Sequence, residues 1–119
     1  MNDNISWVLE LSVKSGEIDN VKALMEEMVQ AIEANEPNAM NYEWYLNEAE
    51  SSIHLYERYA DSDAALVHLG NFGKNFGARF LAAMDATRLS VYGSPSDALT
   101  KELTGFGGVF FPTIGGFSR

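Results

Sequence analysis

The sequence predicts a single α+β domain in which one antiparallel sheet carries helices on one face. Three observations support this prediction. The patterned segments follow the order strand, helix, strand, strand, helix, strand. The strand segments place apolar residues at alternate positions, and the longest helical segment repeats them at intervals of three and four. With 119 residues, of which 46% are hydrophobic, the chain can form one core, which we place at about residues 5–92, with an extension at 93–119.

The first two elements have the clearest patterns. A strand is predicted over residues 5–14, and a turn follows at 15–17. An amphipathic helix is predicted from Ile18 to about Asn35, because its apolar and charged residues occupy opposite sides. Pro37 ends it, since the residue before a proline disfavours the helical conformation.

A β-hairpin is predicted next, with strands at residues 39–47 and 52–60 and a loop at 48–51. A four-residue loop sets Trp44 opposite Leu55 and Tyr42 opposite Glu57. These residues share one face of the hairpin with Tyr59.

The second half of the chain completes the pattern. Asp61 and Ser62 offer capping oxygens to a helix that reaches Leu69. The glycines of residues 70–77 predict a loop or an irregular turn, and a second helical piece runs to about Met84. A strand at residues 87–92 and a short helix at 98–103 follow. This order predicts a ferredoxin-like fold with a C-terminal helix and tail.

The tail at residues 105–119 is rich in glycine and phenylalanine. Its aromatic residues are Phe106, Phe110, Phe111 and Phe117. Because exposing them to water is unfavourable, we predict an ordered tail that packs as a covering strand, as a lid over a pocket or against a partner subunit.

The sheet face that the helices leave open also carries aromatic residues. Val8, Tyr45, Tyr56 and Arg58 fall on this face by strand parity. An open aromatic face favours burial against a second copy, so we predict a homodimer that uses this face.

Charge and composition exclude several classes of protein. Seventeen acidic and eight basic residues give a net charge of −9, which repels nucleic acid and anionic membranes. The chain has no cysteine and no apolar run that would span a bilayer, and its first residues do not resemble a signal peptide. We therefore expect a cytoplasmic protein with no nucleic-acid or membrane partner. No nucleotide-binding fingerprint is present.

One stretch resembles a known family. Residues 55–59, Leu-Tyr-Glu-Arg-Tyr, and residues 64–69, Ala-Ala-Leu-Val-His-Leu, are similar to a strand end, acidic turn and Ala-Leu-His pattern. That pattern is found in the antibiotic biosynthesis monooxygenase family, also called dimeric α+β barrel proteins. The resemblance covers roughly residues 7–91. It implies a dimeric α+β barrel and an activity such as cofactor-free oxidation of phenols or quinols, haem degradation or sugar isomerisation.

The chain differs from two branches of that family. The haem-degrading branch has an asparagine, a tryptophan and a haem-ligating histidine where this chain has Leu9, His68 and residues 73–77. The isomerase-like branch has a second histidine that this chain lacks before Phe76. The resemblance therefore implies no haem, and we expect no cofactor.

Two residues are candidates for catalysis. His68 is a general base if its imidazole is neutral, or a packing histidine. Glu57 lies on the apolar parity of its strand and needs a partner such as Tyr42 or His68, so it is either catalytic or structural. His54 has the opposite parity to Glu57, so no metal site is predicted there.

Four aromatic residues are candidates for binding a planar substrate, or for the core: Tyr42, Trp44, Tyr59 and Phe72. We expect His68 to face a cavity between the sheet and the second helix. Two functions remain open, a cofactor-free monooxygenase acting on a small phenol, quinol or polyketide-like compound, and a non-catalytic dimer that binds a small apolar ligand.

Overall fold

The computed structural model describes residues 2–119, which form one five-stranded sheet and four helices. The strand order is β2-β3-β1-β4-β5. The elements are β1 (Ile5–Val13), α1 (Ile18–Asn35), β2 (Ala39–Leu46), β3 (Ser52–Tyr59), α2 (Ser62–Asn75), α3 (Gly77–Ala83), β4 (Met84–Tyr92), α4 (Asp97–Gly105) and β5 (Gly108–Phe111). The predicted α+β ferredoxin-like fold is confirmed.

The hairpin has the predicted register. Tyr42 pairs with Glu57 and Trp44 with Leu55. All pairs among β2, β3, β1 and β4 are antiparallel. The added strand β5 runs parallel to β4, so the whole sheet is mixed rather than antiparallel as predicted. The direction changes because α4 carries the chain back along the sheet before β5 begins, as a parallel pair requires.

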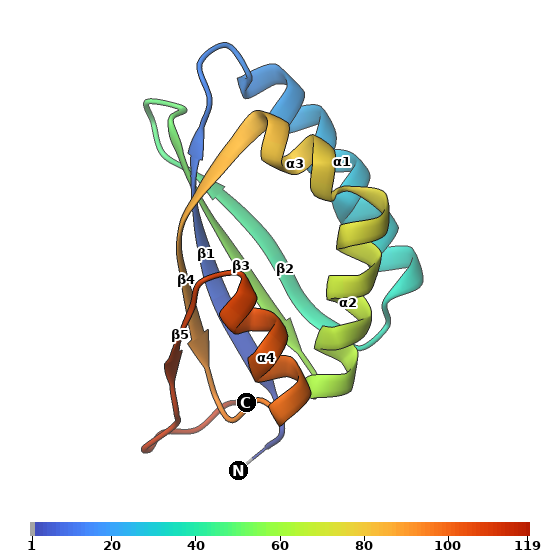
Figure 1. Ribbon diagram of the computed structural model, residues 1–119, viewed down its shortest axis with the longest axis vertical. Helices are drawn as coiled ribbons and strands as arrows, with labels where there is room; N and C mark the ends of the chain where they lie inside the picture. The colour runs from blue at the N-terminus through green and yellow to red at the C-terminus, as the bar shows by residue number, and fades with distance from the viewer. Residues whose placement is uncertain (1) are drawn as a thin grey trace.

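The helices cover one face of the sheet. Figure 1 shows α1, α2 and α3 together on one side, with α4 nearer the end where both termini lie. Alternate strand residues and the apolar sides of the helices form two neighbouring core clusters. One cluster centres on α1 and α3, and the other contains α4 residues Leu99 and Leu103.

The second helix is longer than predicted. No loop occupies residues 70–77, because α2 continues to Asn75 and α3 starts at Gly77 after a break at Phe76. Glycine inside a helix costs only about 1 kcal/mol relative to alanine. Phe72 offsets this cost by packing edge-to-face on Phe80 in the core. The fourth strand also begins earlier than predicted, at Met84.

The start of α2 is fixed by two different hydrogen bonds. Asp61 is the N-cap, and its Oδ1 accepts from the backbone N–H of Ala64 at 2.8 Å. Ser62 Oγ instead accepts from the backbone N–H of Ser96 at 2.9 Å. Ser96 in turn caps α4, so this pair joins the first turns of the two helices.

The tail is less buried than predicted. Phe110 is half-buried and packs on the cluster that contains Leu99. Phe106 and Phe111 are exposed, and Phe117 keeps 82% of its surface exposed. Of the three predicted arrangements, residues Gly108–Phe111 adopt that of a covering strand, because β5 pairs with β4 at the edge of the sheet. Packing of the exposed phenylalanines against a partner subunit stays a prediction.

None of the four helices in residues 2–119 lies over the opposite face of the sheet (Figure 1). Tyr45 is 55% exposed, and Tyr92 and Phe111 form a half-exposed aromatic pair with ring centroids 5.9 Å apart. Tyr56 lies on the same face between Val8 and Glu43. The homodimer through this face stays a prediction. None of the helices in residues 2–119 is long and apolar enough to cross a membrane.

Candidate active site

Three separate elements bring ionisable side chains together under the helices. Glu36 follows α1, Glu57 lies in β3, and His68 lies in α2. His68 Nδ1 is 3.0 Å from Glu36 Oε1, and His68 Nε2 is 3.1 Å from Glu57 Oε1. All three residues are buried, with exposures of 8% or less. The imidazole therefore bridges two carboxylates inside the protein.

Tyr59 extends this cluster. Its hydroxyl donates to Glu57 Oε1 at 2.7 Å. Burial, followed by the charge of Glu57, raises the pKa of Tyr59 above its ordinary value, so the hydroxyl keeps its proton. The ring lies 5.1 Å from that of His68 and 5.0 Å from that of Trp7, measured between centroids. Tyr59 thus fixes the orientation of Glu57 and packs on the imidazole.

The two carboxylates determine the charge of His68. Burial by itself lowers the pKa of an imidazole, but hydrogen bonds and charges from Glu36 and Glu57 raise the pKa of His68 from 6.5 to about 9. At pH 7 the ring is an imidazolium and has no free lone pair. The neutral general base expected from the sequence therefore does not match this environment, and His68 is placed instead to donate a proton or to stabilise an anion.

Glu36 is the member of the cluster that the sequence analysis missed. Its backbone N–H bonds to Ile32 at the end of α1, and Pro37 follows it. An acidic residue at the negative end of a helix dipole is unfavourable unless a cation compensates for it. His68 supplies that cation, and Asn71 Nδ2 contacts the other carboxylate oxygen at 3.4 Å. An acidic residue at the C-terminal end of α1 was therefore the sequence feature that could have indicated a cationic partner for Glu36.

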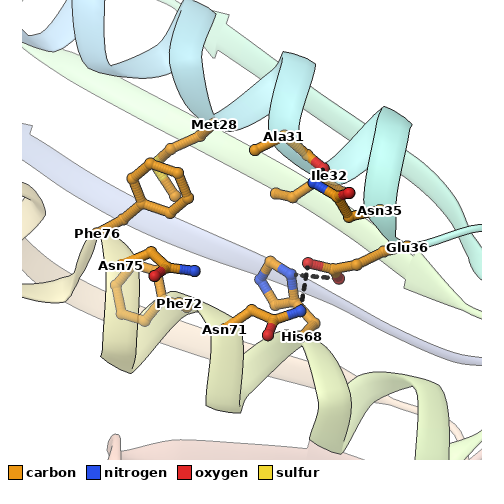
Figure 2. A pocket seen from close by; sticks show the side chains of 10 residues that line it. All are labelled: Met28, Ala31, Ile32, Asn35, Glu36, His68, Asn71, Phe72, Asn75 and Phe76. Atoms are coloured by element: carbon orange, nitrogen blue, oxygen red, sulfur yellow. Dashed lines mark hydrogen bonds and ion pairs between the residues drawn. The ribbon is translucent and has the colours of Figure 1, made fainter.

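Two cavities adjoin the imidazole. Figure 2 shows the outer one, which lies between α1 and α2 and has a volume of ≈ 180 Å³. Besides Glu36 and His68, its polar lining residues are the amides Asn35, Asn71 and Asn75. Met28, Phe72 and His68 belong to this wall and also to that of the inner cavity.

The inner cavity lies between the helices and the sheet and measures ≈ 110 Å³. Its wall is mostly apolar and is contributed by β1, β2, β3, β4 and the four helices or their ends. Glu57, His68 and Tyr42 are its ionisable lining residues. An apolar pocket with a few convergent polar groups is the usual form of a small-molecule site.

The predicted site residues divide into two groups. His68, Glu57, Tyr42 and Phe72 line the inner cavity. Tyr59 and Trp44 do not line the cavity but contact residues that do. The Tyr59 hydroxyl donates to Glu57, and the centroid of the Trp44 ring lies 6.2 Å from that of Tyr42. His68 therefore lies within reach of Glu57 and beside a cavity, as the sequence predicts.

No metal centre is formed by the part of the chain that the structure describes, residues 2–119. His54 lies on the open face of the sheet, where its Nε2 is 3.7 Å from Glu10. It is thus separated from Glu57 by strand parity, as the sequence predicts.

Comparisons with known proteins bear on this fold. The crystal structure of MupZ from Pseudomonas fluorescens is 22% identical, covers 99% of this chain and 96% of its own, and has a TM-score of 0.88. SnoaB, a cofactor-independent oxygenase from Streptomyces nogalater, is 14% identical over 79% of this chain and 95% of its own, with a TM-score of 0.66. At these identities the likeness shows the fold alone.

A third solved structure, a conserved protein from Methanosarcina mazei Go1, is 16% identical over 75% of this chain and 90% of its own, with a TM-score of 0.64. None of the curated proteins compared with the chain matches it. The sequence profile of antibiotic biosynthesis monooxygenases matches residues 5–86, which include β1 through α3 and the cluster of Glu36, Glu57 and His68. The chain belongs to the antibiotic biosynthesis monooxygenase family.

Proposed function

We propose that this protein is a cofactor-free monooxygenase that oxidises a small phenol or quinol in the inner cavity. One observation carries the proposal: a buried Glu36–His68–Glu57 cluster forms part of the wall of an otherwise apolar cavity. The family and the fold shared with a cofactor-independent oxygenase support the same reaction class.

Glu57 is the base in this proposal. Its Oε1 accepts a hydrogen bond from Tyr59 and forms an ion pair with His68 Nε2, whereas Oε2 makes no hydrogen bond within residues 2–119. A phenol in the inner cavity gives its proton to this free oxygen. The imidazolium of His68, 3.1 Å from Glu57, stabilises the resulting phenolate. Glu36 keeps His68 protonated from the other side.

The phenolate then supplies every electron that O₂ requires. For a simple phenol, C₆H₅OH and O₂ give the quinone C₆H₄O₂ and H₂O, so one oxygen atom enters the ring and the other leaves as water. The substrate is oxidised by four electrons and no external reductant takes part. The apolar wall of the cavity excludes water from the reactive intermediates.

Oxygen consumption tests the proposal. We expect uptake of O₂ and formation of a quinone when the protein is incubated with a panel of phenols and quinols. Glu57→Gln should reduce the rate by about 10²–10⁴. Glu43→Gln is the matched control, since Glu43 is an exposed carboxylate on the neighbouring strand. Inertness toward the whole panel would contradict the proposal and favour a non-catalytic ligand-binding protein.

The charge of His68 favours a second candidate. An imidazolium beside a carboxylate is a proton donor next to a proton acceptor, which is sufficient for a proton-transfer reaction without O₂, such as an isomerisation. Conversion of a substrate under nitrogen, with incorporation of deuterium from D₂O, would support this candidate. A strict requirement for O₂ would exclude it.

A further inference from the structure

The wall of the inner cavity includes both buried and exposed residues. Glu57 and His68 are buried, with exposures of 3% and 4%. Leu81 and Phe106 line the same cavity but keep 56% and 53% of their surfaces exposed, and the exposed Ala86 lines it as well. A cavity whose wall passes from buried to exposed residues opens to solvent at the exposed ones. We call Leu81, Ala86 and Phe106 the mouth of the inner cavity.

The register of the sheet separates the ionisable groups from the mouth. Glu57 on β3 lies opposite Trp7 of β1. Ala86 on β4 lies opposite Leu11 of the same strand. Four residues of a strand span about 13 Å. Since β3 and β4 are on opposite sides of β1, the cavity runs obliquely across the sheet from Glu57 to the mouth.

Phe106 is held at the mouth by the turn that joins α4 to β5. Its backbone N–H donates to the carbonyl of Leu103 at 3.1 Å, and Leu103 is a buried lining residue of the cavity. Gly107 follows with a φ of 80°, which glycine adopts without strain. A Cβ atom on Gly108 would lie 2.9 Å from the Leu103 carbonyl oxygen, so the chain turns closely here. The backbone of Phe106 is thus fixed, while its ring stays half-exposed.

This side of the mouth lies outside the segment that matches the family. The family profile ends at residue 86, whereas α4 and Phe106 belong to the C-terminal extension. Figure 1 shows α4 apart from α3, toward the end of the sheet where the termini lie. The extension therefore supplies a wall of the cavity that residues 5–86 do not.

The size of the cavity requires a larger ligand to reach the mouth. An engineered cavity that encloses benzene measures about 150 Å³, whereas the inner cavity measures ≈ 110 Å³. An aromatic ring with a polar group at Glu57 and His68 fills this volume, so any further substituent extends to the mouth. Leu81 and Phe106 offer that substituent apolar surface that otherwise contacts water.

We propose that the inner cavity takes an amphipathic ligand, whose polar head lies at Glu57 and His68 and whose apolar tail passes out through the mouth. The inference deepens the proposed function and rests on it only in assigning the ligand to this cavity. It adds that a phenol with an apolar substituent is preferred to phenol itself, and that Leu81 and Phe106 determine this preference.

Benzyl alcohol, 4-ethylbenzyl alcohol and 4-butylbenzyl alcohol are suitable probes. They share one polar head, differ in the length of the tail and have no phenolic proton, so their binding is measured without turnover. We expect titration calorimetry to show that each added CH₂ group strengthens binding about 2–4-fold, where the upper value corresponds to complete burial of the group. Affinity that falls as the tail lengthens would show a closed cavity and overturn the inference, as would no binding of any probe.

Substitution at the mouth identifies where the tail lies. Phe106→Ala and Leu81→Ala should each reduce the gain to about 1.5-fold or less per CH₂ group and leave the affinity for benzyl alcohol within about 2-fold. Both side chains are more than half exposed, so the variants should fold, which thermal melting checks. Phe117→Ala is the matched control, since Phe117 is 82% exposed and lines a different pocket. An unchanged gain in both mouth variants, or an equal loss in Phe117→Ala, would overturn the inference.

These measurements also separate the inference from the proposed function. A gain with tail length that depends on Phe106, together with inertness toward phenols, would reject the oxygenase and retain the amphipathic ligand. Oxidation of phenols with a kcat/KM that is independent of tail length and unchanged in Phe106→Ala would retain the oxygenase and reject the inference.

Discussion

The two sides of the sheet differ in the side chains that they bury and expose. The layer between the sheet and the helices contains the carboxylates of Glu36 and Glu57 and the imidazole of His68, each at an exposure of 8% or less, and the imidazole is paired with both carboxylates. On the open face the charged groups are near water, and aromatic rings including Tyr45 and the Tyr92–Phe111 pair are not covered by any helix or strand of residues 2–119. The buried ionisable side chains thus find their partners within the chain, whereas the exposed aromatic side chains do not.

This contrast assigns different roles to the faces. Holding buried charges in a low-dielectric interior costs free energy that an apolar core of the same volume avoids. Proteins keep such groups where their chemistry is used, so the covered face is the place to look for activity. The open face, whose aromatic rings lack a cover, is the place to look for a second copy.

Removal of His68 should have the largest effect. His68→Ala leaves two buried carboxylates without their cation, so we expect the free energy of unfolding to fall by about 3–5 kcal/mol. Turnover of a substrate should also fall by about 10²–10⁴. Urea denaturation and steady-state kinetics measure the two effects.

The chain provides a matched control on the other face. His54→Ala removes an exposed imidazole whose contact with Glu10 is 3.7 Å long, so the change in unfolding free energy should stay within about 0.5 kcal/mol. If the two histidine variants lost equal stability, the contrast between the faces would fail.

The charge of His68 should make stability depend on pH. The pKa of His68 is about 9 in the folded protein and 6.5 as the ordinary value, so the folded state holds the proton more tightly. The stabilisation is complete below pH 6.5 and is lost as the pH rises through 9; a shift of this size corresponds to on the order of 3 kcal/mol. Denaturation at pH 6 and above pH 9 measures the loss, which His68→Ala should abolish. A flat profile in the unaltered protein would show that the imidazole is neutral.

The open face should control association. We expect light scattering at micromolar concentration to give twice the chain mass of 13.1 kDa. Tyr56→Asp should weaken this dimer by about 10-fold or more, because it buries an unpaired charge in the interface. Val67→Asp is the control, since Val67 is 57% exposed and lies on α2, in the helical layer on the other side of the sheet. A monomeric unaltered protein, or equal effects of the two changes, would contradict the dimer prediction.

Shortening the tail should have the smallest effect. Removal of residues 112–119 deletes exposed residues outside the sheet, so the unfolding free energy should change by no more than about 0.5 kcal/mol. Removal of residues 108–119 also deletes β5 and uncovers part of the α4 cluster, with an expected loss of about 1–3 kcal/mol. Thermal melting of the two shortened chains measures both losses of stability. An equal loss of stability in the two chains would show that residues 112–119 pack on the rest of the protein.

The sequence by itself determined the order of the core elements and the face on which each strand residue lies. Strand parity depends only on a period of two, and a four-residue hairpin loop fixes the register, so the pairing of Tyr42 with Glu57 follows from local rules. The phase of α2 follows in the same way from its N-cap, which places His68 toward the sheet.

The tertiary structure alone decided how the site is charged. Glu36 and His68 are 32 positions apart, and their contact depends on how the end of α1 packs against α2, which no local pattern encodes. With both carboxylates in place, the imidazole changes from an expected neutral base to a cation. Tertiary packing also decided two features of the fold. The helix α2 continues through Gly70 and Gly73 because packing of Phe72 on Phe80 outweighs the low helix propensity of glycine. The strand β5 runs parallel to β4 because α4 packs along the sheet before it.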